Sequence, residues 1–291
     1  KATMHSGKVR NRGIELQLDG TPVKTKNFTW NSTFTWAKNY NKVLSLAAGL
    51  TDGQTIAYTG GTNCALIAKV GGSIGDIYGY KLKRAPDGQV VWKDGITART
   101  TEFEYVGNAY PAWKAGFSNE FSYKNFRVSI LFDGQWGGIV YSQTHHKMTE
   151  HGTLKHTLKY RENPNFEVVG EGVMLDERGQ YVPNNVPISV SKYYADYWRR
   201  ANVETNSFDA SFLKLREARI EYTIPSAGVN KIGIERLTLA LYGRNLAMWT
   251  KDFPVYDPEV ATLNNGTIVP GSEMGQLPST RTMGFNLTLK F

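Results

Sequence analysis

Histidine and carboxylate side chains gather in one short stretch, and they are the first candidates for chemistry. The stretch runs from His145 and His146 through Glu150 and His151, and His156 follows it. Imidazole and carboxylate groups at this spacing meet on a short helix, where they could ligate a metal ion. The spacing fits no recognised metal motif, however. We therefore expect a solvated helix in a loop, with no metal and no other cofactor.

Three carboxylates are candidates for glycoside hydrolysis, which needs two carboxyl groups flanking one glycosidic bond. They are Glu104, Asp133 and Glu221, and the sequence shows no pairing among them. A serine and a histidine cannot be placed together either. We predict no catalytic residue, so the chain is expected not to be an enzyme, and carboxylates in a polar channel would instead tune its selectivity.

Aromatic side chains form two clusters that could contact a ligand. Flat rings stack on sugar rings, while neighbouring Asp and Asn side chains hydrogen-bond to hydroxyl groups. The same rings could instead pack long loops together, and this is the role that the pattern favours. The residues are Tyr78, Tyr80, Trp92 and Trp113 in the first cluster, and Tyr193, Tyr194 and Trp198 in the second.

Seven segments alternate apolar residues with small or polar ones, which predicts seven β-strands. The clearest is the last, where Met283, Phe285, Leu287, Leu289 and Phe291 are apolar at every second position. A strand of about 9–11 residues with this pattern can cross a bilayer as part of a barrel. The other segments lie at residues 14–19, 28–39, 117–123, 126–133, 218–224 and 237–242.

The residues between the apolar ones indicate which kind of β-protein this is. They are largely Thr, Asn, Arg, Glu and Gln, which would be costly in a packed apolar core. They suit a water-filled interior, with Phe, Trp, Ile and Leu facing lipid. Aromatic residues near strand ends are typical of the girdles at the two membrane surfaces. The candidates for these girdles are Trp30, Trp36, Tyr123, Tyr222 and Trp249.

The connections between the predicted strands alternate in length, as periplasmic turns and extracellular loops do in outer-membrane barrels. The short turns fall at residues 19–24, 124–125 and 225–234, and the long loops at about 41–114, 138–207 and 248–279. Seven strands would leave open edges in lipid, and bacterial barrels use even numbers of strands. We therefore predict an all-β transmembrane antiparallel barrel, of which residues 1–291 form the C-terminal part.

Composition excludes some other classes of protein. The 291 residues carry a net charge of +8, but their Lys and Arg are scattered, which argues against nucleic-acid binding. No apolar run approaches the roughly 18 residues of a membrane helix. A lone cysteine, Cys64, makes no internal disulfide or zinc site. Residues 1–5 show no signal peptide, so export requires that such a segment was removed or that the chain begins within a longer protein.

Several motifs, in this order and spacing, resemble the SusC/RagA family of TonB-dependent outer-membrane transporters of Bacteroidetes. The resemblance spans nearly the whole chain. The matching segments are NRGIEL at 11–16, IYGY at 77–80, YVGNAYP at 105–111, SFLKLREAR at 211–219, YGRNL at 242–246, DPE at 257–259 and PSTR at 278–281.

The resemblance implies a barrel of about 22 strands with an N-terminal plug. It further implies a TonB-box segment, a SusD-like lipoprotein lid, and import of oligosaccharides or, in some members, oligopeptides. The chain matches only the last third of such a transporter and lacks the plug, the TonB box and the first strands. Phe291 would then be the signal read by the barrel-assembly machinery, and Asp257-Pro-Glu259 would shape the third long loop.

Three alternatives stay open at this point. A siderophore or cobalamin receptor would share the architecture and differ in its cargo. A soluble carbohydrate-binding β-sandwich would bury its apolar faces between two sheets. A barrel enzyme in the outer membrane would need a catalytic group that the sequence does not place. The alternation within the strands and the alternating loop lengths together predict that the protein lies in the outer membrane.

Overall fold

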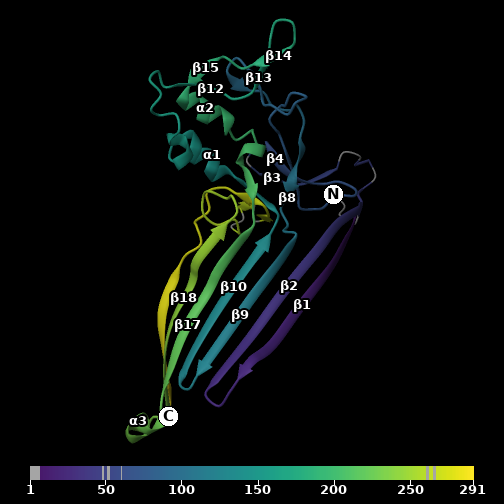
Figure 1. The fold of residues 1–291 in the computed structure, drawn as a ribbon. Helices are drawn as coiled ribbons and strands as arrows, with labels where there is room; N and C mark the ends of the chain where they lie inside the picture. Colours follow the sequence, from purple (N-terminus) through teal and green to yellow (C-terminus); the bar gives the residue numbers. More distant parts are fainter. Residues whose placement is uncertain (1–6, 48, 51–52, 60, 260–261, 265–266) are drawn as a thin grey trace.

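The computed structural model describes residues 7–47, 49–50, 53–59, 61–259, 262–264 and 267–291. It has two parts, a wall of long tilted strands and a cap that stands on one end of this wall (Figure 1). The first residues, 1–6, for which a signal peptide was considered, lie outside the described part. Among the described residues, no helix is long and apolar enough to cross a membrane.

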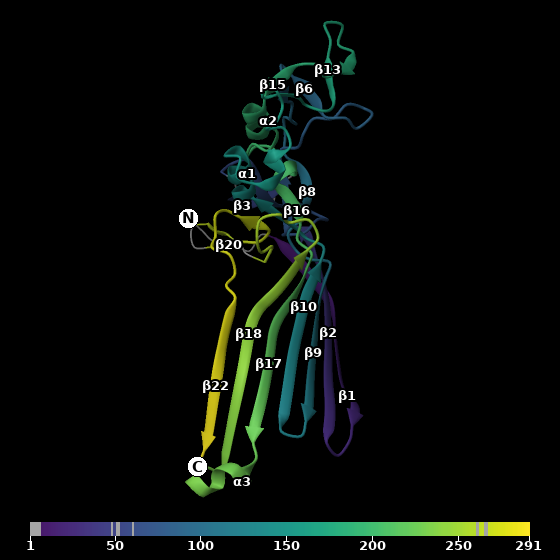
Figure 2. The same ribbon diagram turned by 60° about the vertical axis from the view of Figure 1, so that its left-hand side comes forward.

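The wall is one antiparallel sheet of seven strands, as the sequence predicted. Each strand pairs with the next long strand in the chain, because the intervening loops return to the same end of the sheet (Figures 1 and 2). In spatial order the strands are β1 (Lys8–Lys24), β2 (Phe28–Ser45), β9 (Trp113–Tyr123), β10 (Phe126–Trp136), β17 (Phe212–Ile224), β18 (Arg236–Thr250) and β22 (Thr282–Lys290).

The register of the wall places the apolar residues of all seven strands on one face. Residues directly opposite each other share a face, and Phe117 pairs with both Phe34 and Phe132. Toward the other edge, Leu241 pairs with Phe285. Leu241 is 63% exposed and Phe285 is 77% exposed. These side chains are open to the surroundings, so the β-sandwich alternative, which would bury them between two sheets, is wrong.

Asn119 is a polar residue on the apolar face. It pairs with Ser32 and Ile130, and its side chain is buried. The Trp30 indole N–H donates a hydrogen bond to its Oδ1 at 2.9 Å. A polar group in hydrocarbon needs a partner within the protein, and the indole provides one.

The predicted turn at residues 19–24 is wrong. Strand β1 continues to Lys24 and passes through a bulge between Gly20 and Val23. Pro22 lies in this bulge, where it has no partner in β2 and its missing N–H breaks no hydrogen bond between these two strands. The chain reverses after Lys24, where the Thr25 N–H donates to the Phe28 carbonyl oxygen at 2.7 Å.

The short connections lie at the end of the wall opposite the cap (Figure 1). Residues 124–125 form a two-residue turn with Lys124 in the left-handed region, at φ 51°. The link between β17 and β18 carries α3 (Ser226–Val229) and η3 (Asn230–Ile232). Apart from the shifted first turn, the alternation of short and long connections is confirmed.

Four of the five aromatic residues predicted for the girdles lie near strand ends, and their place at a membrane surface stays a prediction. Trp30, Tyr123 and Tyr222 lie near the ends of strands β2, β9 and β17 that are remote from the cap, and Trp249 lies near the cap. Trp36 is the exception, because it falls in the middle of β2. It still shares the apolar face, since it pairs with Ala115 and Leu16.

The three long loops fold into the cap rather than lying over the wall as irregular chain. Parallel pairing joins different loops. Strand β6 (Val91–Lys93) pairs with β13 (Val173–Leu175), and β11 (Ile139–Ser142) pairs with β21 (Ser272–Glu273). One apolar core draws on all three loops through Cys64, Ile77, Tyr141, Val203 and Val269. The loops therefore pack on one another, which explains how segments this long keep a fixed shape.

The elements of the cap follow in chain order. The first loop contains β3 (Gln54–Thr59), β4 (Cys64–Ala68), β5 (Asp76–Gly79), β6 (Val91–Lys93), β7 (Ile96–Thr97) and β8 (Glu104–Asn108). The second contains β11 (Ile139–Ser142), α1 (Gln143–Glu150), η1 (Lys155–Leu158), β12 (Glu167–Val169), β13 (Val173–Leu175), β14 (Tyr181–Pro183), β15 (Pro187–Ser189), α2 (Val190–Tyr197), η2 (Glu204–Asn206) and β16 (Ser207–Asp209). The third contains β19 (Thr262–Asn264), β20 (Thr267–Val269) and β21 (Ser272–Glu273).

Candidate functional site

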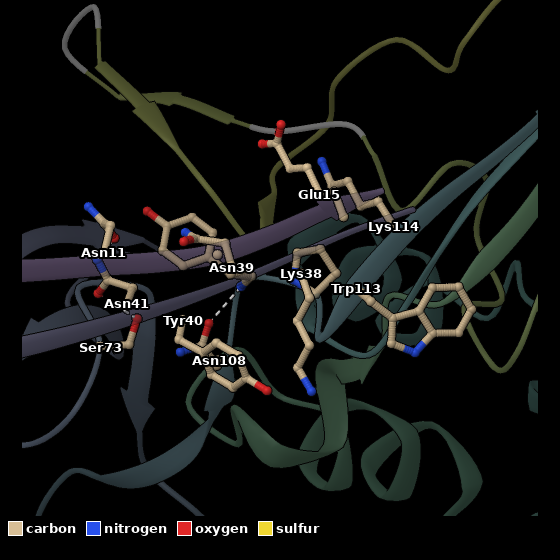
Figure 3. A pocket seen from close by; sticks show the side chains of 14 residues that line it. Asn11, Glu15, Lys38, Asn39, Tyr40, Asn41, Ser73, Asn108, Trp113 and Lys114 are labelled. Atoms are coloured by element: carbon tan, nitrogen blue, oxygen red, sulfur yellow. Dashed lines mark hydrogen bonds between the residues drawn. The ribbon is translucent and has the colours of Figure 1, made fainter. Parts of the chain in front are cut away.

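A hollow of about 830 Å³ lies where the wall meets the cap (Figure 3). Strand β2 continues past its last pair with β9, Ala37 with Lys114, and the hollow fills the gap that opens there. Figure 3 shows the side chains of Glu15 and Lys114 on one side of strands β1, β2 and β9. The side chain of Lys38 lies on the opposite side of the same strands. The polar side chains that line it are Asn11, Glu15, Lys38, Asn39, Tyr40, Asn41, Ser73, Asn108, Tyr110 and Lys114.

Amide groups fix one rim of this hollow. The Asn41 Nδ2 donates to Asn11 Oδ1 at 2.7 Å. The Asn41 Oδ1 accepts from the Ser73 hydroxyl at 3.0 Å and from the Ile74 N–H at 2.8 Å. Asn41 therefore ties the first loop to the ends of β1 and β2, which gives the rim a defined shape.

A second amide, that of Asn108, extends this network. The Asn108 Nδ2 donates to Asp76 Oδ1 at 2.7 Å, and the Asn108 Oδ1 accepts from the Tyr110 N–H at 2.7 Å. Asp76 is buried, and its other oxygen accepts from the Ser73 N–H at 2.8 Å. The network thus joins the first loop to β2 through Asn41 and Ser73, and it holds the polar groups of the hollow in place.

A smaller hollow of about 460 Å³ continues along the polar face of the wall. It shares Glu15 and Lys114 with the first and extends to Gln17, Thr35 and Asp133. Side chains of this kind offer donors and acceptors to hydroxyl or amide groups and lack a nucleophile with a partnered base. The geometry suits binding and passage of a polar solute.

The DPE segment of the third loop reaches this track and is held there by two basic residues of β17. The Lys214 Nζ lies 2.7 Å from both carboxylate oxygens of Asp257 and 2.5 Å from Glu259 Oε2. The Arg216 guanidinium contacts Glu259 at 2.6 Å and Asp133 at 2.5 Å. Burial opposes ionisation of Asp257, but its hydrogen bonds, that from Lys214 foremost, lower its pKa below the usual value. We call these five residues the carboxylate clamp.

Sequence reasoning missed a second anchor, the buried carboxylate of Glu273. It accepts hydrogen bonds from the hydroxyls of Ser142, Thr144 and Tyr256 and from the Gly275 N–H. These donors come from the second and third loops, so Glu273 joins the two loops in the cap. In the sequence, Glu273 is a single charged residue among a few apolar ones, and this pattern does not identify a buried carboxylate.

Three of the predicted ligand-binding aromatics are buried inside the cap. Trp92, Tyr193 and Tyr194 are all less than 10% exposed. Trp92 stacks on Tyr193 with ring centres 6.0 Å apart, and Trp198 stacks on Tyr194 at 5.5 Å. Their contact with a ligand stays a prediction, but this packing favours the alternative role of holding the loops together.

The other predicted aromatics lie nearer the wall. Tyr78 meets the ring of Tyr105 edge-on, and Tyr80 meets that of Phe103 in the same way. Trp113 belongs to β9 rather than to the first loop, because β9 begins two residues before the predicted end of that loop. It stacks on Trp136, its partner in β10, with ring centres 6.4 Å apart, and its backbone borders the large hollow.

The predicted solvated histidine helix is also wrong, because α1 packs inside the cap. His145 and His146 are buried, and their ring nitrogens lie 2.9 Å from Asn206 Oδ1 and 2.8 Å from the Trp198 carbonyl oxygen. Burial lowers the pKa of His145 to about 4. Within the described residues, no group of three or more potential ligands is placed to hold a metal ion.

The three carboxylates considered for hydrolysis lie apart. Asp133 pairs with Arg216 in the carboxylate clamp. Glu221 pairs with Arg219 on the same strand at 2.6 Å, and Glu104 belongs to β8 in the cap.

Comparison with known proteins gives a consistent result. No protein-family model matches the chain. TonB-dependent receptors P26 and P3 of Formosa agariphila are 29% and 24% identical to it, each over 98% of the chain and 29% of their own length. The TonB-dependent receptor SusC of Bacteroides thetaiotaomicron is 25% identical over 48% of the chain and 15% of its own length.

The solved structure of the RagAB peptide transporter matches the fold with a TM-score of 0.66 over 98% of this chain and 30% of that one, at 19% identity. This chain is SusC/RagA-like. The SusC/RagA-like wall is part of an outer-membrane β-barrel, as the relatives' names and its two faces together indicate. Four relatives that match 98% of this chain are much longer than it is. The chain spans only about 30% of the length of each of them. Those relatives are named as receptors and transporters and not as enzymes.

Proposed function

We propose that the chain forms the C-terminal wall and the extracellular mouth of an active outer-membrane importer. The observation that carries this proposal is the two-faced wall. Its apolar face suits lipid, while its polar face carries a track that begins at the hollow beneath the cap. A solute of polar chemistry can bind at the mouth and then pass along donors and acceptors that replace its water.

The energy for import would come through TonB acting on a plug outside this chain. The names of the Formosa and Bacteroides relatives as TonB-dependent receptors support this part. The remaining strands and the plug would complete the barrel, and a SusD-like lipoprotein would cover the mouth as a lid. The cap, which rises beyond one end of the wall, supplies a surface on which such a lid can sit (Figure 2).

Oligosaccharides are the cargo that we propose first. The hollow is lined by four asparagines, Asn11, Asn39, Asn41 and Asn108, and by Tyr40 and Tyr110. Amide groups bind sugar hydroxyls, and tyrosine offers both a ring face and a hydroxyl. The partly exposed rings of Tyr78 and Tyr80, in the first loop, are the positions at which we expect stacking.

Oligopeptides are the second candidate, and one feature of the hollow favours them. Glu15 and Lys114 lie on the same face of the wall, because both are opposite Ala37 in the register. Opposite charges at this spacing suit the two ends of a short peptide. The structural match is also to a protein described as a peptide transporter.

Uptake by cells that carry the full-length protein tests the proposal. Labelled oligosaccharides, oligopeptides, a ferric siderophore and cobalamin are offered to cells with and without a functional TonB. We expect TonB-dependent uptake of one of the first two classes, and its loss by several-fold in Lys114→Gln. The matched change Lys24→Gln, at the far end of β1, should leave uptake unchanged. Uptake of only the siderophore or cobalamin, or equal uptake by both variants, contradicts the proposal.

A further inference from the structure

The apolar face of the wall carries a groove near the cap that the proposed import path does not use. Its volume is about 450 Å³. It crosses strands β9, β10 and β17, and Phe34 of β2 and Trp249 of β18 close its sides. The groove therefore lies on the opposite side of the sheet from the polar track, although both involve the same strands.

Small residues make the floor of this groove. Ala115 pairs with Gly134, and Gly134 pairs with Leu213. A Cβ on Gly134 would lie 2.5 Å from the Phe212 carbonyl oxygen, so the position excludes every larger residue. Ala115 and Gly134 project little from the sheet, whereas the neighbouring pair of Phe117 and Phe132 projects further and borders the groove.

Aromatic rings make the walls. Trp113 and Trp136 stack above the floor with ring centres 6.4 Å apart, and Trp136 is 50% exposed. On the side toward the middle of the membrane, Phe117 and Phe132 border the groove. Flat rings about a narrow floor give a slot that fits an extended hydrocarbon chain rather than a bulky or polar group.

A polar lip closes the end of the slot nearest the cap. The Lys251 Nζ lies 5.2 Å from the centre of the Trp136 ring and 2.6 Å from a carboxylate oxygen of Asp209. Ion pairs of this kind sit where headgroups meet water, and they mark the depth at which hydrocarbon ends. The slot therefore runs from the headgroup level into the hydrocarbon region.

We propose that this groove, lined by Ala115, Gly134, Trp113, Trp136 and Trp249, holds one acyl chain of a membrane lipid. The slot opens directly into the lipid-facing belt through Phe117 and Phe132, so an acyl chain of the surrounding lipid can enter it. In the slot the chain gains packing contacts with the aromatic rings. The proposal rests on the placement of the wall in the membrane and not on the cargo or on TonB.

Native mass spectrometry of the full-length protein, purified from outer membranes through a series of detergent washes, tests the proposal. We expect one lipid to remain bound after the bulk lipid has gone. Ala115→Leu fills the floor and should lower the retained fraction several-fold, because the added side chain occupies the space that the acyl chain would take. Ala218→Leu is the matched control, since Ala218 pairs with Ile130 on the same apolar face outside the groove.

Photo-crosslinking of the unaltered protein gives a second measurement that does not depend on a variant. A phospholipid with a diazirine in its acyl chain is incorporated into vesicles with the protein, and labelled peptides are sequenced. We expect labels concentrated in residues 113–117 and 132–136. Even labelling along the whole belt, crosslinks of the groove to a second copy of the protein, or equal lipid retention by Ala115→Leu and the unaltered protein would each overturn the proposal.

Discussion

The ammonium group of Lys214 lies 2.7 Å from each carboxylate oxygen of Asp257, and both residues are only 2% exposed. Lys214 belongs to β17 of the wall, whereas Asp257 belongs to the third loop, 43 residues further along the chain. A charge pair so well shielded from water is stable only if both partners are present. The contact therefore couples the position of the loop to that of the wall, beside the polar track.

Removal of one partner should release the third loop. In Lys214→Met, Asp257 would be left as a buried charge with fewer donors, and we expect a cost of about 3–5 kcal/mol. The measurement is limited proteolysis of the full-length protein, in which cleavage between residues 251 and 279 should become much faster.

The double change Lys214→Met with Asp257→Leu provides the control for this prediction. It removes both charges and should restore much of the resistance to protease, because a buried pair replaced by apolar groups is often neutral in stability. If the single variant is cleaved no faster than the unaltered protein, the clamp does not hold the loop.

The two faces of β18 should respond oppositely to a charge. Leu241 lies on the apolar face and pairs with Ile220 and Phe285. We expect Leu241→Arg to lower the free energy of unfolding in vesicles by about 2–4 kcal/mol, because the charge would face lipid. Thr238→Arg, on the polar face of the same strand, should cost much less. Equal losses in urea-induced unfolding would contradict the assignment of the faces.

Mild acid should weaken the cap near α1. Burial lowers the pKa of His145 from 6.5 to about 4. Between these two pH values the imidazole is protonated in the unfolded segment and neutral in the folded one. Stability present above pH 6.5 is therefore lost as the pH falls toward 4, by up to about 3 kcal/mol. Amide hydrogen exchange in residues 143–150 at pH 7 and pH 5, corrected for intrinsic rates, measures the loss.

The matched variants for this pH effect are His145→Phe and His151→Phe. The first removes the buried titrating group and should flatten the pH dependence of exchange. The second changes an exposed residue at the end of α1 and should leave the dependence unchanged. An unchanged profile in His145→Phe would show that another group is responsible.

Assembly of the barrel should depend on the terminal aromatic residue. Phe291 follows β22 and is 78% exposed, so its ring is available for recognition. We expect Phe291→Ala to lower the amount of heat-modifiable folded protein in the outer membrane several-fold, while Lys290→Ala leaves it nearly unchanged. The two variants are compared by gel mobility before and after boiling, and equal amounts would exclude a signal at this residue.

The wall was predictable because its determinants are local. Alternation with period two assigns each residue to a face without knowledge of its partners. It predicted all seven strands and both faces, including those of Phe285 and Leu241. The exception was the turn near Pro22, where a bulge on the edge strand imitates the residue chemistry of a turn. Strand ends were also longer in the structure than in the pattern, because the alternation fades where strands leave the membrane.

Sequence by itself thus determined the strands of this protein, their faces and the resemblance of its motifs, since each depends on spacing along the chain. Only the tertiary structure decided what the long loops do. It buried Trp92, Tyr193 and His145 in the cap, joined Lys214 to Asp257 and surrounded Glu273 with hydroxyl groups from two loops. These outcomes depend on contacts between residues far apart in sequence, and a buried polar group finds its partners only when the chain has brought them together.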